Sequence, residues 1–151
     1  MSEYEFTVSL RIRHPTIDPL AITATLGLQP QHSWQAGQPR CDPAGEELGG
    51  AHRDSYWIAR LREEPLLSSD SISLEGVLLK TLSNLRRAQA FLEQLNAEGG
   101  VAELLVSLYA RDDFRLELTS DSLALLGRVR LAVVLDVHAH SPLEAPVSKA
   151  N

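Results

Sequence analysis

The chain contains one cysteine, Cys41, so it cannot form an internal disulfide. This excludes the disulfide-dense scaffolds that are typical of small secreted proteins. Its first residues, MSEYEFTVSL, lack the charged and then apolar pattern of a signal peptide. No apolar run approaches the roughly 20 residues that a helix needs to cross a bilayer. We therefore expect a cytoplasmic protein that does not bind to membranes.

Positive charge is also scarce. The chain has 14 Lys and Arg residues against 20 Asp and Glu residues, which gives a net charge of −6. The small clusters at Arg86–Arg87 and at Arg128 and Arg130 are too sparse to form a basic track. Because binding to a phosphate backbone requires concentrated positive charge, we do not expect nucleic acid as a partner.

Aromatic residues make up only 5% of the chain, so its core must consist mainly of Leu, Val, Ile and Ala. A length of 151 residues with 44% hydrophobic content suits one globular domain. We expect this domain to span residues 1–140 and a flexible C-terminal tail to span residues 141–151.

The most strand-like stretch is Val129–His138, with the sequence VRLAVVLDVH. Side chains alternate across a strand, so the odd-numbered residues from Leu131 to Val137 share one apolar face. The even-numbered face begins apolar and becomes ionisable at Asp136 and His138. This pattern predicts a sheet with one buried face and one partly open face.

The rest of the chain alternates between strand and helix patterns. The strands we predict are Tyr4–Arg13, Ser55–Leu61, Val101–Ala110 and Phe114–Leu118, the last two forming a hairpin. The first two helices that we predict are Pro19–Leu26, with Asp18 and Gly27 as caps, and Leu74–Ala97. The third is a short helix that Thr119 or Ser120 caps and that runs to about Leu126, after which Gly127 turns the chain. The predicted fold class is α+β, a two-layer sandwich. Its mostly antiparallel or mixed five-stranded sheet carries one long and two short helices on one face.

Residues 28–54 are rich in Pro, Gly and Gln and have no sustained periodicity. We expect a long irregular loop, and loops of this length are uncommon unless they are functional or disordered. Trp34 is costly to expose, so it is expected to fix the first half of the loop to the domain. The Asp42–Gly50 half has no such anchor and is expected to be mobile.

Short motifs in a fixed order resemble those of a known family. They are ITATLGLQP at Ile22–Pro30, Gly37, SYW at Ser55–Trp57 and LAVVLDVH at Leu131–His138. The chain resembles, from about Phe6 to His138, the bacterial family known as domain of unknown function 4279. The family carries no assigned activity. The resemblance implies that its motif residues determine the fold rather than catalyse a reaction; in this chain they are Leu26, Gly27, Pro30, Gly37, Trp57 and Asp136.

No motif predicts a metal site or a catalytic centre. His32, Cys41, His52 and Asp54 are too widely spaced for a typical zinc site. Asp136, His138 and His140 could bind a metal from one strand face, but the same pattern occurs on any open strand face. Neither a G-x-S-x-G elbow nor a phosphate-binding loop is present. Asp136 with His138, and Asp54 with His52, are possible acid–base pairs, yet nothing else converges on them. We predict no catalytic residues, no metal ligands and no cofactor.

Two hypotheses about function remain open. The first is a non-catalytic binding module, immunity-like or regulatory, that meets a protein partner as a monomer or a homodimer. The second is a small enzyme or a ligand-binding protein with a pocket between the 29–54 loop and the open sheet face. Either hypothesis places the site where that loop meets the open face, at Trp34, Arg11, Arg13, Asp136 and His138.

Overall fold

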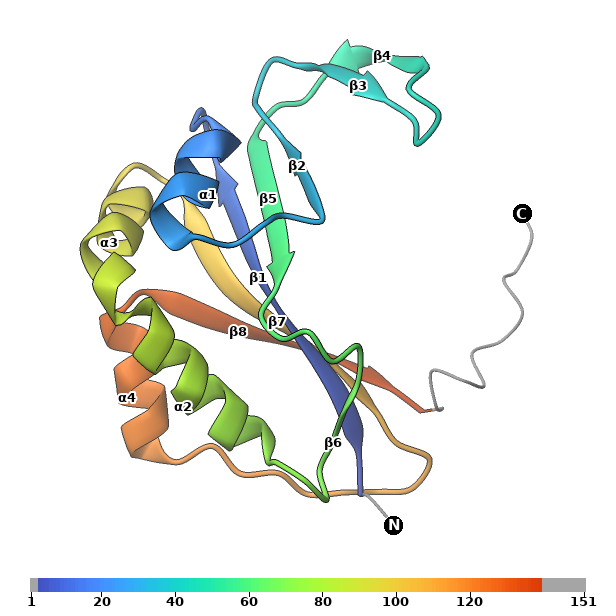
Figure 1. The fold of residues 1–151 in the computed structure, drawn as a ribbon, viewed down its shortest axis with the longest axis vertical. Helices are drawn as coiled ribbons and strands as arrows, with labels where there is room; N and C mark the ends of the chain where they lie inside the picture. The colour runs from blue at the N-terminus through green and yellow to red at the C-terminus, as the bar shows by residue number, and fades with distance from the viewer. Residues whose placement is uncertain (1–2, 140–151) are drawn as a thin grey trace.

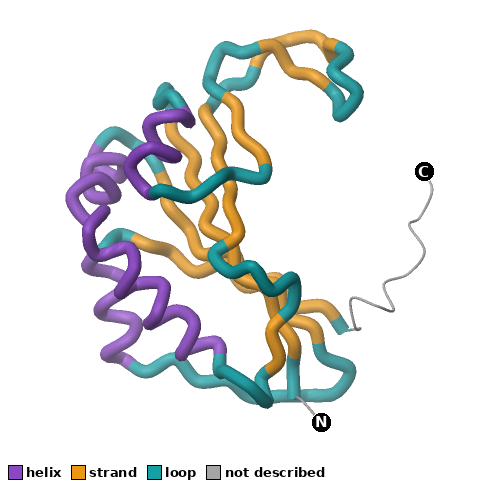
Figure 2. The backbone as a smooth tube through the Cα atoms, viewed as in Figure 1, coloured by secondary structure: helices purple, strands orange, loops and turns teal. Residues whose placement is uncertain are grey.

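The structure is a computed structural model that describes residues 3–139, and its architecture is the predicted α+β sandwich. One mixed sheet has the strand order β2-β5-β1-β7-β8, and β6 pairs with β1 outside this order. The helices all lie on one face of the sheet, and the other face is open (Figures 1 and 2). The strands of this sheet are β1 (Glu5–His14), β2 (His32–Trp34), β5 (Ser55–Arg60), β6 (Leu67–Ser68), β7 (Val101–Tyr109) and β8 (Leu131–His138).

The central strand β1 organises the sheet. It pairs antiparallel with β7 on one side and with β5 and β6 on the other. Phe6, Leu10 and Ile12 are fully buried under the helices, whereas the odd-numbered residues between them stay partly exposed. The alternation that we read from the sequence therefore sets which face the helices cover.

Strand β8 runs parallel to β7, and α4 (Ser120–Arg128) lies in the connection between them. The predicted strand Phe114–Leu118 is wrong. Its apolar residues do turn toward the core in alternation, and the Phe114 ring lies 5.0 Å from the Tyr4 ring. The segment nevertheless joins no sheet, because parallel strands require a crossover and this stretch provides it. The turn into β8 is at Arg130, which has a φ of 59°, and Gly127 lies inside α4.

The predicted long helix Leu74–Ala97 is divided in three. It consists of α2 (Leu74–Leu85), the 3₁₀ turn η1 (Arg86–Ala88) and α3 (Gln89–Ala97). Buried residues occur at Leu82, Leu85 and Ala88, three residues apart. A 3₁₀ turn places residues three apart above one another, so it keeps this row on the core, whereas an α-helix would rotate it away.

Residues 28–54 are not the irregular loop that we predicted. β2 joins the edge of the main sheet beside β5, and β3 (Pro39–Cys41) pairs with β4 (Glu47–Ala51) in a separate hairpin. We call residues 35–54 the arm. Figure 1 shows the hairpin of the arm projecting beyond the sheet on the side away from the helices, and every residue in β3 and β4 is exposed.

The helix ends follow the sequence signals closely. Asp18 accepts a hydrogen bond from the Leu20 N–H at the start of α1 (Pro19–Leu26), and Gly27 ends it with a φ of 69°. Thr119 caps α4 in the same way, through the Ser122 N–H. The Thr119 N–H donates to the Glu75 carboxylate at 2.6 Å, which lowers the pKa of Glu75 and joins the starts of α2 and α4.

Within residues 3–139, no helix is both long enough and apolar enough to cross a bilayer.

The junction between α3 and β7 is packed tightly against the end of β1. The buried His14 ring accepts the N–H groups of Thr16 and Ile17 at Nδ1, so its Nε2 donates to Glu98 at 2.8 Å. The Gln94 amide and, after it, this ring lower the pKa of Glu98. A Cβ at Gly100 would lie 2.8 Å from the Leu95 carbonyl oxygen, a distance that real side chains do not adopt.

We predict that Gly100→Ala lowers the free energy of unfolding by about 1–3 kcal/mol, because the backbone beside it must move. Gly127→Ala is the matched control. A Cβ there meets nothing within 4 Å, and alanine favours helix by up to about 1 kcal/mol. Urea denaturation of both variants tests this, and equal midpoints for the two would contradict the tight packing at Gly100.

Candidate functional site

The open face of the sheet is formed by the side chains that point away from the helices. On β1 these are the odd-numbered residues, and the strand register adds their neighbours on β2, β5, β7 and β8. Each sequence-predicted site residue belongs to this face. We call it the open face.

A cavity forms beside β1, between the two strands β5 and β6 that pair with the same side of β1. After β5, the Leu61 N–H donates a last hydrogen bond to the Val8 carbonyl of β1 at 3.3 Å. The chain pairs with β1 again only at β6, where Leu67 lies opposite Phe6. The residues between, Arg62–Leu66, bulge away from the sheet. They include Pro65, which cannot donate a ladder hydrogen bond.

This cavity has a volume of about 580 Å³, within the usual range for small-ligand pockets. Polar groups converge on it from three strands and the bulge. Thr7 and Ser9 contribute hydroxyls from β1, Tyr109 contributes its ring from β7, and Arg60 lies opposite Ser9 on β5. The remaining lining residues are Val8, Gln31, Arg62, Glu64, Pro65, Leu66 and Leu67.

The charges at the cavity favour an anion weakly. Arg62 pairs with Glu64 at 3.3 Å, so these two charges largely offset each other. The backbone N–H of Glu64 and, after it, Arg62 lower the pKa of this carboxyl, so it stays ionised at neutral pH. Arg60 makes no ion pair with any residue between 3 and 139, and its guanidinium supplies the surplus positive charge.

Trp34 lies in a stack of three rings where the arm meets the sheet. Its ring centroid is 4.2 Å from that of His52 and 4.5 Å from that of Tyr56, and both pairs are nearly parallel. Both faces of the indole are therefore covered by the protein itself. This geometry suits the anchoring role that we expected, since the stack joins both ends of the arm to β5.

The two arginines on β1 differ in their surroundings. The Arg11 Nε donates to Glu103 on β7 at 3.1 Å, and both side chains are largely shielded from solvent. Arg13 is exposed and lies opposite Tyr56, next to the ring stack. Arg11 thus holds two strands together, while Arg13 is available at the surface.

Asp136 and His138 lie at the opposite corner of the open face. Asp136 is opposite Ser107, and the His138 ring stacks on Tyr109 at 4.8 Å. Tyr109 is in turn opposite Glu5, which is eight residues from Arg13 along β1, about 26 Å at 3.3 Å per residue. The five predicted residues therefore share one face but do not form one site.

Within residues 3–139, no cluster of three or more His, Cys, Asp or Glu side chains could hold a metal ion, and His140 lies outside the described residues. The cavity lining offers hydroxyls from Thr7, Ser9 and Tyr109 but no histidine that could serve as their base. The arrangement can bind and orient a ligand.

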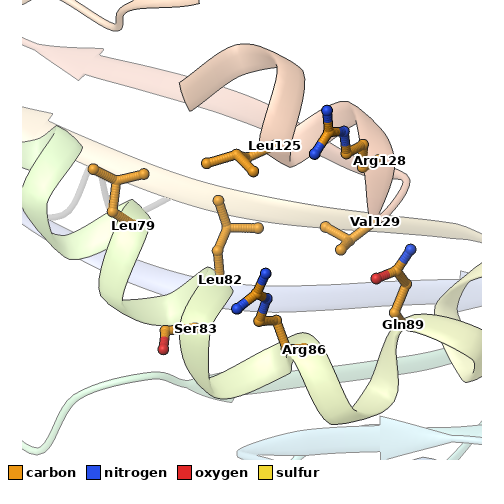
Figure 3. Close-up of a pocket in the computed structure, with 8 residues that line it drawn as sticks. All are labelled: Leu79, Leu82, Ser83, Arg86, Gln89, Leu125, Arg128 and Val129. Atoms are coloured by element: carbon orange, nitrogen blue, oxygen red, sulfur yellow. The ribbon is translucent and has the colours of Figure 1, made fainter. Parts of the chain in front are cut away.

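A second cavity lies on the helix side, between α2 and α4 (Figure 3). It measures about 310 Å³, at the lower end of the ligand range. Figure 3 shows Leu82 and Leu125 facing each other across it, with Arg86 and Arg128 on either side. Since the buried core residues Leu82 and Val129 are part of its lining, we interpret it as the space between two packed helices.

A family model for domain of unknown function 4279 matches residues 3–140. The chain belongs to this family. No curated protein and no solved structure matches the chain. The family motif residues lie at points that define the fold: Gly27 and Gly37 both have positive φ, and Trp57 is fully buried with its indole N–H on Thr23. Asp136 differs from them, because it is exposed on β8.

Sequence reasoning missed the cavity although it placed several lining residues on the open face. The alternation of side chains along β1 and β5 places Thr7, Ser9 and Arg60 on that face. The segment Arg62–Leu66 carried no signal beyond that of a linker, and the two-residue strand β6 is too short for any periodicity. The strand-breaking Pro65, between Glu64 and Leu66, is the feature of this segment that indicates a bulge.

We predict that Trp34→Ala loosens the arm while the main sheet stays folded. Two stacked ring pairs are lost, each contributing about 0.5–1.5 kcal/mol beyond its buried area. Hydrogen exchange should quicken at residues 35–54 and stay unchanged in β1 and β7. His32→Ala, an exposed change on the same strand, is the control and should alter stability by no more than about 0.5 kcal/mol. If hydrogen exchange at residues 35–54 is unchanged in the Trp34→Ala variant, the anchoring role is refuted.

Proposed function

We propose that this protein is a non-catalytic binding module that holds a small organic anion in the open-face cavity. The supporting observation is the cavity itself. Its size suits a ligand, its polar groups converge from β1, β5 and β7, and its one carboxylate, Glu64, is held by Arg62. Cys41, exposed and outside any disulfide, suits a reducing cytoplasm as the place of action.

The lining indicates the chemical class of the ligand. Pro65, Leu66 and Leu67 offer an apolar wall. Arg60, which has no ion pair within residues 3–139, lies opposite Ser9 and its hydroxyl. An apolar body would contact the wall while a carboxylate or a phosphate accepts hydrogen bonds from Arg60 and Ser9. In a regulatory protein such ligand binding alone can perform the function, whereas an immunity-like role would require a protein partner.

We predict that octanoate, a simple apolar carboxylate, binds the protein and shifts the amide resonances of Thr7, Ser9 and Leu66. Arg60→Ala should weaken this binding tenfold or more, about 1.4 kcal/mol. Arg128→Ala, at the cavity between α2 and α4, is the control and should leave the dissociation constant unchanged. Resonance shifts confined to α2 and α4, or no shifts at all, would refute the proposed site.

A protein partner is the second candidate, and the arm is the observation that favours it. Its two-stranded hairpin is exposed throughout, including Leu48 at 56%, and isolated hairpins are only marginally stable in water. A partner that packs against β3 and β4 would bury this apolar side chain and fix the hairpin.

We predict that shortening the arm, with residues 39–51 replaced by Gly-Ser-Gly, abolishes binding to such a partner. The measurement is calorimetry with the purified products of neighbouring genes. Octanoate binding serves as the internal control, because the replaced residues do not line the cavity. A partner that binds the shortened protein with unchanged affinity would exclude the arm.

A further inference from the structure

Strand β8 forms one edge of the sheet and is built unlike the other edge. The opposite edge strand, β2, has three residues and leads directly into the arm. β8 has eight residues in regular register with β7, and no described strand between residues 3 and 139 pairs with its outer side. It carries no proline, lysine or bulge, three of the features by which proteins protect an edge from pairing, and Asp136 is its one acidic residue.

The hydrogen bonds of β8 show which backbone groups face outward. The His138 carbonyl accepts the Ala110 N–H from the end of β7 at 3.1 Å. Backbone groups alternate sides along a strand, so the even-numbered residues of β8 face β7. The N–H and C=O groups of four residues therefore face outward: Leu131, Val133, Leu135 and Val137.

Helix cover ends halfway along this strand. The odd-numbered side chains all lie on the helix-covered face, in register with the buried residues of β7. Leu131, next to α4, is 6% exposed, whereas Leu135 is 43% and Val137 is 64% exposed. Their β7 neighbours Val106 and Leu108 are fully buried, so the exposed apolar row belongs to the edge alone. Figure 1 shows β8 starting beside α4 and running away from the helices.

We propose that a second copy of this chain pairs antiparallel with β8 around a two-fold axis at Val134. In this register Leu131 lies opposite Val137 of the second copy, and Val133 lies opposite Leu135. All four outward-facing residues then form pairs, each exchanging two hydrogen bonds. An axis at Val133 or Leu135 would satisfy only three pairs, and an axis at Asp136 would place two carboxylates together.

The same register covers the exposed apolar row. Because Leu131 of one copy lies opposite Val137 of the other, the α4 of each copy comes next to the uncovered half of the other β8. The covered half of each strand thus meets the uncovered half of the other, as a symmetric interface requires. On the open face, Asp136 meets the small Ala132 side chain, which leaves room for solvent around the carboxylate. Stable interfaces bury at least about 1,000 Å², and a pair of strands forms only a small interface. We therefore expect the dimer to have a dissociation constant in the micromolar range.

Sedimentation equilibrium of the full chain over the micromolar range tests this pairing. We expect a reversible dimer, and Val137→Lys should weaken it tenfold or more, since each copy would place a charge against an apolar row. Val137 is exposed in the single chain, so this variant should keep its melting temperature. Leu20→Lys, at an equally exposed residue of α1, is the control and should not alter dimerisation. A monomer at every concentration, or a dimer unaffected by Val137→Lys, overturns the proposal.

A cysteine at the axis tests the register. In a Cys41→Ser background, Val134→Cys should form a disulfide-linked dimer under mild oxidation, since Cα atoms directly opposite across a non-bonded pair lie about 4.5 Å apart. Ala132→Cys lies on the same face of the same strand, but its two copies would be four residues apart, about 13 Å. Linkage at Ala132 and not at Val134 would overturn the register.

Discussion

The strict alternation of apolar and polar residues along β1 is the constraint on which the rest of the molecule depends. Three strands pair with β1, so its even-numbered face becomes the floor of the whole core, and every helix packs on that side. The odd-numbered residues carry hydroxyls and charges whose burial under a second helix layer would cost several kcal/mol each without partners. The sheet must therefore keep one face open.

An open face has to be stabilised without a hydrophobic layer, and the protein uses cross-strand contacts to do so. Arg11 and Glu103 bridge β1 and β7, the rings of Trp34 and Tyr56 stack between β2 and β5, and Tyr109 stacks on His138 between β7 and β8. These contacts occupy most of the polar and aromatic groups on the face. The gap between β5 and β6 differs, because there the hydroxyls of β1 and the Arg60 guanidinium border an unfilled volume. This difference is why binding is proposed at the gap and not at the ring stack.

Local sequence signals predicted the elements whose stabilisation is itself local. The caps Asp18, Gly27 and Thr119 lie where side-chain chemistry and backbone conformation require them. β1 and β8 were found because eight or more alternating residues define a period. The same rule failed for Phe114–Leu118, since an extended crossover over a core alternates like a strand, and only the pairing of β7 with β8 distinguishes the two. The break in the long helix was missed because neither proline nor glycine marks it. The candidate residues on the open face were assigned to the correct face, but their division between two distant corners depends on strand order.

The sequence by itself determined the fold class, which face of each long strand is apolar, both ends of α1 and the start of α4. These properties follow from interactions between residues that are close along the chain. The tertiary structure alone decided that β8 lies at an edge with its helix cover incomplete, that β2 and β6 join the sheet, and that a cavity opens beside β1. Each of these depends on which strands become neighbours, and that choice is made by the packing of the entire core, because strands of two or three residues and an edge position leave no periodic signal in the sequence.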